Sequence, residues 1–181
     1  GRKMEFIEYL KEKGAKFKVD RHWETQTAEQ LAVVEHVLDA EVVKPVLVKA
    51  DGKFYLCVLP GSLKIDFRKL EKALGARKVD IANEHELRKV FADCELGAEP
   101  PVGEPYGIET LMDRTLVSES FIVFGDGHRN EAVRMSMRGF LKLAMPRMLD
   151  FSELTDWSPT QAMIYDPYFY DMFWYHPLYP L

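Results

Sequence analysis

The sequence of 181 residues contains only two cysteines, Cys57 and Cys94, and no long hydrophobic run. Two cysteines cannot by themselves form a disulfide framework or a four-ligand zinc site. The longest apolar runs, such as Phe121-Ile122-Val123-Phe124, have the length of a strand, whereas a membrane helix needs roughly 18 apolar residues. The charged N-terminus has no apolar signal core. We therefore expect a cytoplasmic protein with reduced cysteines and no membrane partner.

The sequence also lacks an excess of positive charge. Its net charge is −5, and residues 146–181 carry most of it, because they hold five acidic side chains against Arg147 alone. Residues 1–145 are therefore almost neutral, and bulk charge does not indicate nucleic-acid binding. Hydrophobic residues make up 47% of the chain and charged residues 29%, as in ordinary globular proteins. This length and composition favour one main domain.

Local patterns predict helices and strands that alternate along the body. Asp51-Gly52 between two apolar runs is a strong hairpin signal, and Thr27-Ala28-Glu29-Gln30 is a capping box that opens a helix. A tight hairpin makes a purely parallel sheet impossible, so we expect an α/β domain with a mixed sheet surrounded by helices. The predicted helices are 3–13, 27–38, 66–74, a short one opening at 83, and one from 136 to 143. The predicted strands are 16–20, 46–50, 54–59, 78–82, 121–124 and 132–135.

The end of the chain differs in composition from the body. Residues 146–181 hold 10 of the 22 aromatic residues and 5 of the 10 prolines. Prolines preclude long helices, while the aromatic density argues against disorder. We therefore expect a domain at 1–145 and a C-terminal extension at 146–181, which packs on the body or on a partner subunit in a homodimer. A role in ligand stacking or partner docking is the alternative.

Three features could carry chemistry. Lys44 precedes Pro45 at the entrance to an apolar strand, where its ammonium could hold a phosphate or carboxylate. The loop 97–107 contains three glycines and three prolines, which could present backbone amides at a fixed point. His128 follows a glycine turn between two strands, and an imidazole can transfer protons near neutral pH. Each also has a plain interpretation, as an edge lysine, a rigid loop and an exposed loop histidine.

Motifs for other chemistries are missing. The sequence has no HExxH or other metal-ligand spacing, no GxGxxG or GxxxxGK[ST], and no nucleophile elbow for a serine triad. We therefore expect neither a metal nor a cofactor. A pairing of Cys94 with His128 is conceivable, although nothing in the local sequence favours it.

Taken together, several stretches resemble the YbaK/EbsC family, which is related to the editing insertion of bacterial prolyl-tRNA synthetases. The similarity covers roughly residues 5–145, and a Gly-x-x-Pro-Pro element lies in register with an upstream lysine and a downstream glycine–histidine turn. The residues that carry it are His22, Thr27-Ala28-Glu29-Gln30, Val43-Lys44-Pro45-Val46, Ala82-Asn83-Glu84-His85-Glu86-Leu87, the run from Phe91 to Gly103, Tyr106-Gly107, Gly125-Asp126-Gly127-His128 and Val133-Arg134-Met135-Ser136.

The resemblance implies an aminoacyl-tRNA deacylase that acts in trans on mischarged aminoacyl-tRNA, with an aminoacyl-tRNA synthetase as a further possible partner. It implies functional roles for Lys44, Gly97 and His128, and attack by water rather than by a protein nucleophile. We expect Lys44 to hold the terminal phosphate or the adenosine end, and amides around Gly97 to bind the aminoacyl end or its oxyanion. We expect His128 to orient the water or the ribose, or to act as a base. The residues expected to contact substrate are His22, Ala98, Glu99, Pro100, Pro101 and Gly127.

Two features depart from the family pattern. Asp126 puts a carboxylate beside the histidine turn, and the residues from Met145 onward lie outside the resemblance. Alanyl-tRNA or a similar small aminoacyl-tRNA is the first expectation for the substrate. Two rival hypotheses are a non-catalytic module that binds a nucleotide or aminoacyl adenylate, and a cysteine-dependent hydrolase that uses Cys94.

Overall fold

The computed structural model describes residues 5–154. The helices in this range are α1 (Phe6–Glu12), α2 (Ala28–Glu35), α3 (Phe67–Leu74), α4 (Glu84–Val90) and α5 (Met137–Ala144). The strands are β1 (Lys18–Arg21), β2 (Val43–Ala50), β3 (Lys53–Pro60), β4 (Leu63–Ile65), β5 (Val79–Ile81), β6 (Glu109–Asp113), β7 (Phe121–Gly125), β8 (Glu131–Ser136), β9 (Arg147–Leu149) and β10 (Ser152–Leu154). Short 3-10 helices occupy Asp39–Glu41, Glu104–Tyr106 and Arg114–Ser118.

Capping side chains fix where several helices begin. The Thr27 side chain accepts a hydrogen bond from the Gln30 amide at 3.1 Å, and the Gln30 side chain accepts one from the Gln26 amide at 2.8 Å. The predicted capping box at α4 also forms. At α5 the Ser136 hydroxyl accepts from the Gly139 amide at 3.0 Å. These bonds satisfy amides that have no partner within the helix, so the caps confirm the predicted helix starts.

The larger sheet has five strands in the order β5-β2-β3-β6-β9. Strand β2 is antiparallel to β5 and β3, whereas β3 pairs with β6 and β6 with β9 in parallel. The β2–β3 hairpin turns at Asp51 and Gly52, whose φ angles of 47° and 85° lie in the left-handed region that this turn requires. The mixed sheet that the sequence predicts is therefore confirmed.

Both faces of the larger sheet are buried, because alternate side chains of a strand point to opposite sides. On one side Leu56, Val58 and Met112 join the largest core cluster, which also contains residues of α1, α5, β7 and β8. On the other side Cys57 and Leu111 pack in a cluster with side chains of α3 and β4. All five of these side chains have no exposed surface.

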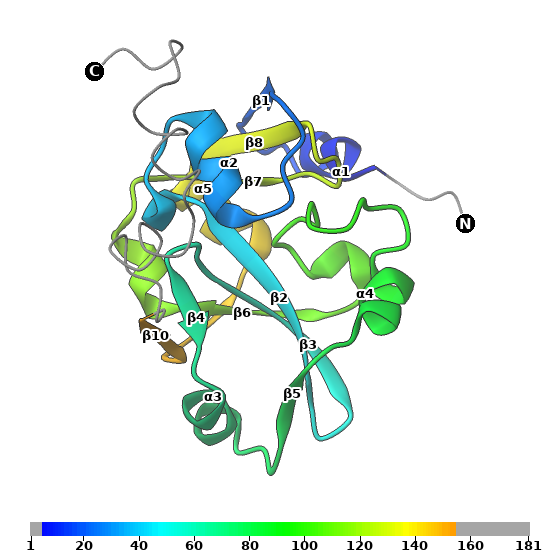
Figure 1. Cartoon of the computed structure of the whole chain (residues 1–181), viewed down its shortest axis with the longest axis vertical. Helices are drawn as coiled ribbons and strands as arrows, with labels where there is room; N and C mark the ends of the chain where they lie inside the picture. Colours follow the sequence, from blue (N-terminus) through cyan, green and yellow to red (C-terminus); the bar gives the residue numbers. More distant parts are fainter. Residues whose placement is uncertain (1–4, 155–181) are drawn as a thin grey trace, which may run out of the picture.

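A second sheet, in the order β1-β8-β7, is antiparallel throughout. In Figure 1 this sheet lies with α1, α2 and α5 in the upper half of the molecule, and the larger sheet runs below it. An isolated parallel bridge between Val42 and Val123 joins the two sheets. This bridge places the start of β2 beside β7, and this junction positions the site described below.

The sheets continue past residue 145, the predicted domain boundary. Strand β9 adds an edge to the larger sheet, and β10 pairs antiparallel with β4. Between them Phe151 has no exposed surface and packs with Leu111 in the same core cluster. The first residues of the predicted extension are therefore part of the body. The rest of that extension, 155–181, lies outside the described residues.

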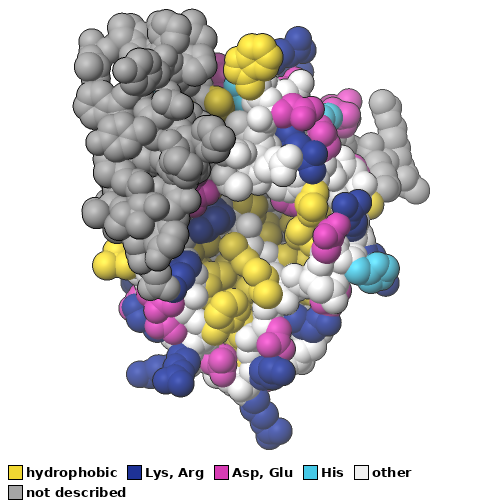
Figure 2. Space-filling model, viewed as in Figure 1, with side chains coloured by type: hydrophobic (Ala, Val, Ile, Leu, Met, Phe, Trp, Pro, Cys, Tyr) yellow, Lys and Arg dark blue, Asp and Glu magenta, His cyan; other side chains and the backbone are white. Residues whose placement is uncertain are grey.

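One face of the molecule shows hydrophobic side chains gathered in its middle and charged side chains around them (Figure 2). In the part of the chain that the structure describes, no helix is both long and apolar enough to cross a membrane.

Candidate active site

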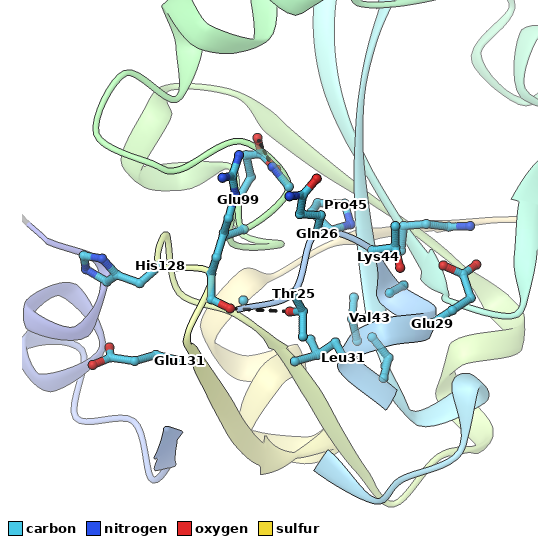
Figure 3. A pocket seen from close by; sticks show the side chains of 17 residues that line it. Thr25, Gln26, Glu29, Leu31, Val43, Lys44, Pro45, Glu99, His128 and Glu131 are labelled. Atoms are coloured by element: carbon cyan, nitrogen blue, oxygen red, sulfur yellow. Dashed lines mark hydrogen bonds between the residues drawn. The ribbon is translucent and has the colours of Figure 1, made fainter. Parts of the chain in front are cut away.

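A pocket of about 330 Å³ lies where the two sheets meet, lined by four separate segments of the chain (Figure 3). Lys44, Gly97 and His128, which are distant in sequence, all belong to its lining. The full lining comprises Thr25, Gln26, Thr27, Ala28, Glu29, Leu31, Val42, Val43, Lys44, Pro45, Gly97, Ala98, Glu99, Gly125, His128, Arg129 and Glu131.

Backbone hydrogen bonds hold these segments together. The Gly127 amide donates to the Ala98 carbonyl at 2.7 Å, which ties the turn after β7 to the 97–99 loop. The Thr25 amide donates to the Arg129 carbonyl at 2.9 Å, which ties the segment before α2 to the same turn. Because these bonds lie between backbone atoms, the pocket walls are set by the chain path rather than by flexible side chains.

Two glycines are required by how closely the walls approach. Gly97 has a φ angle of 89°, and a β-carbon there would stand 2.7 Å from the Gln26 carbonyl oxygen. A β-carbon on Gly125 would stand 2.8 Å from the Ala98 carbonyl oxygen. Real β-carbons do not approach backbone atoms so closely, so any larger residue would push the pocket walls apart.

Lys44 lies at one end of the pocket, near Glu29 (Figure 3). Its ammonium donates a hydrogen bond to the Leu63 carbonyl at 2.5 Å. Burial lowers the pKa of Lys44, and the negative charge of Glu29 opposes that shift. Lys44 is therefore a half-buried cation in the pocket lining, bonded to the Leu63 carbonyl and close to the Glu29 carboxylate.

The Gly97 amide is not free, contrary to what its predicted role as a donor to the substrate requires. It donates to both carboxylate oxygens of Glu99, each at 3.1 Å. Glu99 is 9% exposed, and burial raises the pKa of its carboxyl, while its backbone hydrogen bonds and the charge of Arg129 lower it. At this wall the pocket therefore presents an acceptor.

His128 lies on the opposite side of the pocket from Lys44 and points away from it (Figure 3). Its side chain is 40% exposed, with Nδ1 3.7 Å from a Glu95 oxygen and Nε2 3.8 Å from a Glu5 oxygen. Its backbone amide donates to Asp126 at 3.0 Å. The histidine is therefore at the rim, beside carboxylates that could orient its ring.

Asp126, the departure from the family pattern, lies behind this turn. It is 3% exposed, and its Oδ2 atom is buried without a hydrogen-bond partner in the described structure. Burial and the neighbouring Glu131 carboxyl raise the pKa of Asp126 to about 6, while His128 opposes the shift. The pocket wall that carries Glu131 is thus next to the buried Asp126 carboxyl, whose raised pKa lies just below neutral pH.

The structure separates the other predicted contact residues into two groups. Ala98 and Glu99 line the pocket, whereas His22, Pro100, Pro101 and Gly127 are not among its lining residues. The His22 side chain is 5% exposed, with Nε2 3.9 Å from a Glu35 oxygen. His22 is thus packed beneath α2 rather than presented to a ligand.

Several lining residues were not predicted as site residues, among them Gln26, Glu29 and Arg129. Arg129 donates from Nε to the Leu96 carbonyl at 2.8 Å and so spans two walls. Their signal in the sequence is indirect, because Gln26 and Glu29 flank the capping residue of α2 and Arg129 follows His128.

Cys94 is not placed as a nucleophile. Its sulfur lies 3.5 Å from the Tyr106 hydroxyl, and it is not among the residues that line the pocket. Burial raises the pKa of the thiol to about 11, so the reactive thiolate is scarce at neutral pH. Within residues 5–154, no group of three or more His, Cys, Asp or Glu side chains is arranged to hold a metal ion.

The sequence profile of the aminoacyl-tRNA editing domain matches residues 22–143, which include Lys44, Gly97 and His128. The chain belongs to this family. Membership supports aminoacyl-tRNA deacylation as the general activity of this editing domain, and it confirms the resemblance drawn from the sequence.

Curated relatives of this editing domain are proline–tRNA ligases. That of Streptococcus suis strain 05ZYH33 is 28% identical over 102 residues, which are 56% of this chain and 16% of the ligase. That of Streptococcus pneumoniae strain Hungary19A-6 is 29% identical over 91 residues, which are 50% of this chain and 15% of the ligase. The chain thus spans about one sixth of the length of these relatives.

Solved structures share the fold. The hypothetical protein APE2540 has a TM-score of 0.74 and 26% identity, and the match covers 81% of this chain and 98% of that one. A protein proposed to be a trans-editing enzyme for prolyl-tRNA synthetase has a TM-score of 0.73 and 21% identity, and the match covers 82% and 95% of the two chains. The second likeness shows the fold alone.

Proposed function

We propose that this editing domain hydrolyses the ester of mischarged aminoacyl-tRNA in trans, with a small amino acid such as alanine, on tRNA-Pro or another tRNA, as the group removed. The observation that carries the proposal is the meeting of Lys44, Gly97 and His128 around one pocket. Family membership supports the reaction class, and relationship to proline–tRNA ligases supports tRNA-Pro as the first tRNA to test.

The chemistry needs no protein nucleophile. Water attacks the ester carbonyl carbon to give a tetrahedral intermediate, and the bond to the ribose oxygen then breaks. The amino acid leaves as a carboxylate, and the ribose oxygen recovers a proton. The ribose hydroxyl beside the ester orients the water, accepts its proton in the first step and passes its own proton to the departing ribose oxygen. His128 could act as the base only after its ring turns into the pocket, because it points away from the pocket in this structure (Figure 3).

The pocket residues divide this work. Lys44 holds the adenosine end, because a half-buried ammonium attracts a phosphate or ribose oxygen. Ala98 and Glu99 contact the aminoacyl end. A structural role, without substrate contact, falls to Pro100, Pro101 and Gly127, which fix the backbone of the pocket wall. Buried His22 likewise supports α2.

The volume of the pocket favours a small aminoacyl group. About 330 Å³ is near the lower end for small-molecule sites, which run from roughly 300 to 1,000 Å³. Ribose and a compact side chain would fill much of this space. Because one methylene is worth only about 1–3 kcal/mol, exclusion of larger amino acids by size would be graded rather than absolute.

A deacylation assay on a panel of mischarged tRNAs tests the proposal. Wild type should release a small amino acid, and Lys44→Ala should lower the rate by roughly 100-fold, the scale expected when a substrate is held about 1 Å out of place. Lys53→Ala is the matched control, because Lys53 lies on β3, contacts the Tyr55 ring and does not line the pocket. Binding without turnover on every tRNA would instead support the non-catalytic module.

A further inference from the structure

The proposed chemistry places Glu99 at the aminoacyl end but does not say which group its carboxylate binds. The lining contains three acidic residues, Glu29, Glu99 and Glu131. Glu131 lies 3.5 Å from the Arg21 guanidinium, and Glu29 interacts with the ammonium of Lys44. No side chain in the described range donates a hydrogen bond to Glu99 or lies within ion-pair distance of it.

The hydrogen bonds of Glu99 leave acceptor capacity unused. A carboxylate can accept about four hydrogen bonds, whereas Glu99 accepts only from backbone amides, since both its oxygens share the amide proton of Gly97 and its own amide also interacts with it. Burial raises the pKa of Glu99, and the charge of the nearby Arg129 guanidinium only partly opposes that rise, while the Nε–H of Arg129 is bound to the Leu96 carbonyl. A buried carboxylate in this condition is costly, and a bound cation with several N–H donors would offset the cost.

The position of Glu99 also suits such a cation. Glu99 and Lys44 both line the pocket, and Gln26 lies between them in the view of Figure 3, so the ligand we consider is one that reaches two separate walls. An aminoacyl ester has this form, because an adenosine ester is at one end and an α-ammonium is one carbon beyond the carbonyl. Three N–H donors on that ammonium match the free acceptor sites of Glu99.

We propose that Glu99 binds the α-ammonium of the aminoacyl group and so restricts this pocket to substrates with a free amino group. The inference rests on the proposed function and adds the chemical class of its substrate. It also replaces the predicted donor role of the Gly97 amide, which instead holds the Glu99 carboxylate in place. N-acylated aminoacyl-tRNA, which lacks the ammonium charge, is then a poor substrate.

The test compares alanyl-tRNA with N-acetyl-alanyl-tRNA, which share the same tRNA and the same ester. For wild type, kcat/KM should be at least roughly tenfold lower on the acetylated substrate, the scale of a lost hydrogen bond to a charged group. Glu99→Gln should lower kcat/KM on alanyl-tRNA and bring the two substrates within a few-fold of each other. Glutamine keeps one acceptor oxygen for the Gly97 amide, so the wall is preserved. Glu29→Gln is the matched control and should keep the wild-type preference, whatever its absolute rate.

A binding measurement decides the question without turnover. Calorimetry with 3′-alanylamido-3′-deoxyadenosine and its N-acetyl form should show that wild type prefers the free amine and that Glu99→Gln does not. Equal affinity of wild type for the two ligands would overturn the inference while leaving the deacylation proposal intact. The same holds if Glu99→Gln prefers the free amine as strongly as wild type does. A wild type that prefers the free amine but hydrolyses no mischarged tRNA would support the inference about the ligand and sink the proposed reaction.

Discussion

Gly97 lies directly against Gln26, and the space between them admits no side chain. A β-carbon at position 97 would stand 2.7 Å from the Gln26 carbonyl oxygen, on a residue whose φ angle is 89°. Gly97 therefore serves two needs at once, a left-handed backbone and a close approach of two pocket walls. Only the first of these is a general property of glycine at a turn.

Gly97→Ala should consequently cost more than an ordinary glycine replacement. Gly75 is the matched control, because its φ angle is 64° but nothing lies within 4 Å of its β-carbon position. Gly75→Ala should destabilise by about 1 kcal/mol, the cost of a left-handed alanine. Gly97→Ala should destabilise further and reduce deacylation sharply, because Gln26 must move. Urea denaturation and the deacylation assay measure both effects. Equal losses in the two variants would contradict the packing argument.

Cys94→Ala should leave deacylation within about twofold of wild type. The thiol lies outside the pocket lining, and burial raises its pKa to about 11, so it supplies little thiolate. Cys57→Ala is the companion variant, since Cys57 is fully buried within the core and removal of its sulfur tests stability alone. A large loss of deacylation in a Cys94→Ala variant that remains folded would support the cysteine-dependent hydrolase.

Local signals made much of the fold predictable. The Asp51-Gly52 hairpin and the caps at Thr27 and Ser136 depend on neighbours a few residues away, and each formed as expected. Strand β6 was not predicted, because Glu109–Asp113 has no strong turn signal after it and is held by parallel pairing with β3. Such pairing joins residues more than fifty positions apart, which local patterns do not reveal.

The candidate site shows the same division. Lys44, Gly97 and His128 could be named from their register with a family, and the structure brings them to one pocket. Sequence reasoning could not foresee that the Gly97 amide is bound by Glu99, since this depends on the local backbone angle. Nor could it foresee that His22 faces Glu35, a contact set by the packing of α2.

Asp113→Ala should strongly destabilise the protein. Asp113 has no exposed surface, and its Oδ1 accepts from the amides of Phe151 at 2.9 Å and Ser152 at 3.0 Å, so it holds the segment after β9. Loss of these bonds leaves buried amides without partners and should cost about 3 kcal/mol or more. Asp80→Ala, on the exposed edge strand β5, is the control for removing an aspartate. Urea denaturation that places Asp113→Ala within 1 kcal/mol of the control would refute this role.

The Asp113 carboxylate should also make the unfolding free energy depend on pH. Burial alone would raise the pKa of Asp113, but hydrogen bonds from Thr115, Phe151 and Ser152 outweigh it and lower the pKa below its ordinary value. The stabilisation is therefore complete above the unfolded pKa of about 3.9 and is lost as the pH falls through the folded value. The difference in unfolding free energy between wild type and Asp113→Asn should shrink under acid conditions. A difference that stays constant down to the acid limit of folding would contradict the assignment.

Asp126→Asn should stabilise the protein at neutral pH, whereas replacement of Asp113 destabilises it. The folded pKa of Asp126 is raised to about 6, so the folded state binds the proton more tightly than the unfolded chain does. Unfolding free energy should therefore fall as the pH rises from about 4 to about 6, and the full cost should remain above that window. Asparagine keeps an oxygen for the His128 amide but carries no charge. The advantage of Asp126→Asn over wild type should accordingly grow by roughly 2–3 kcal/mol between pH 4 and pH 7, as measured by urea denaturation at each pH. If the unfolding free energies of wild type and Asp126→Asn change in parallel with pH across that range, then Asp126 does not ionise within it.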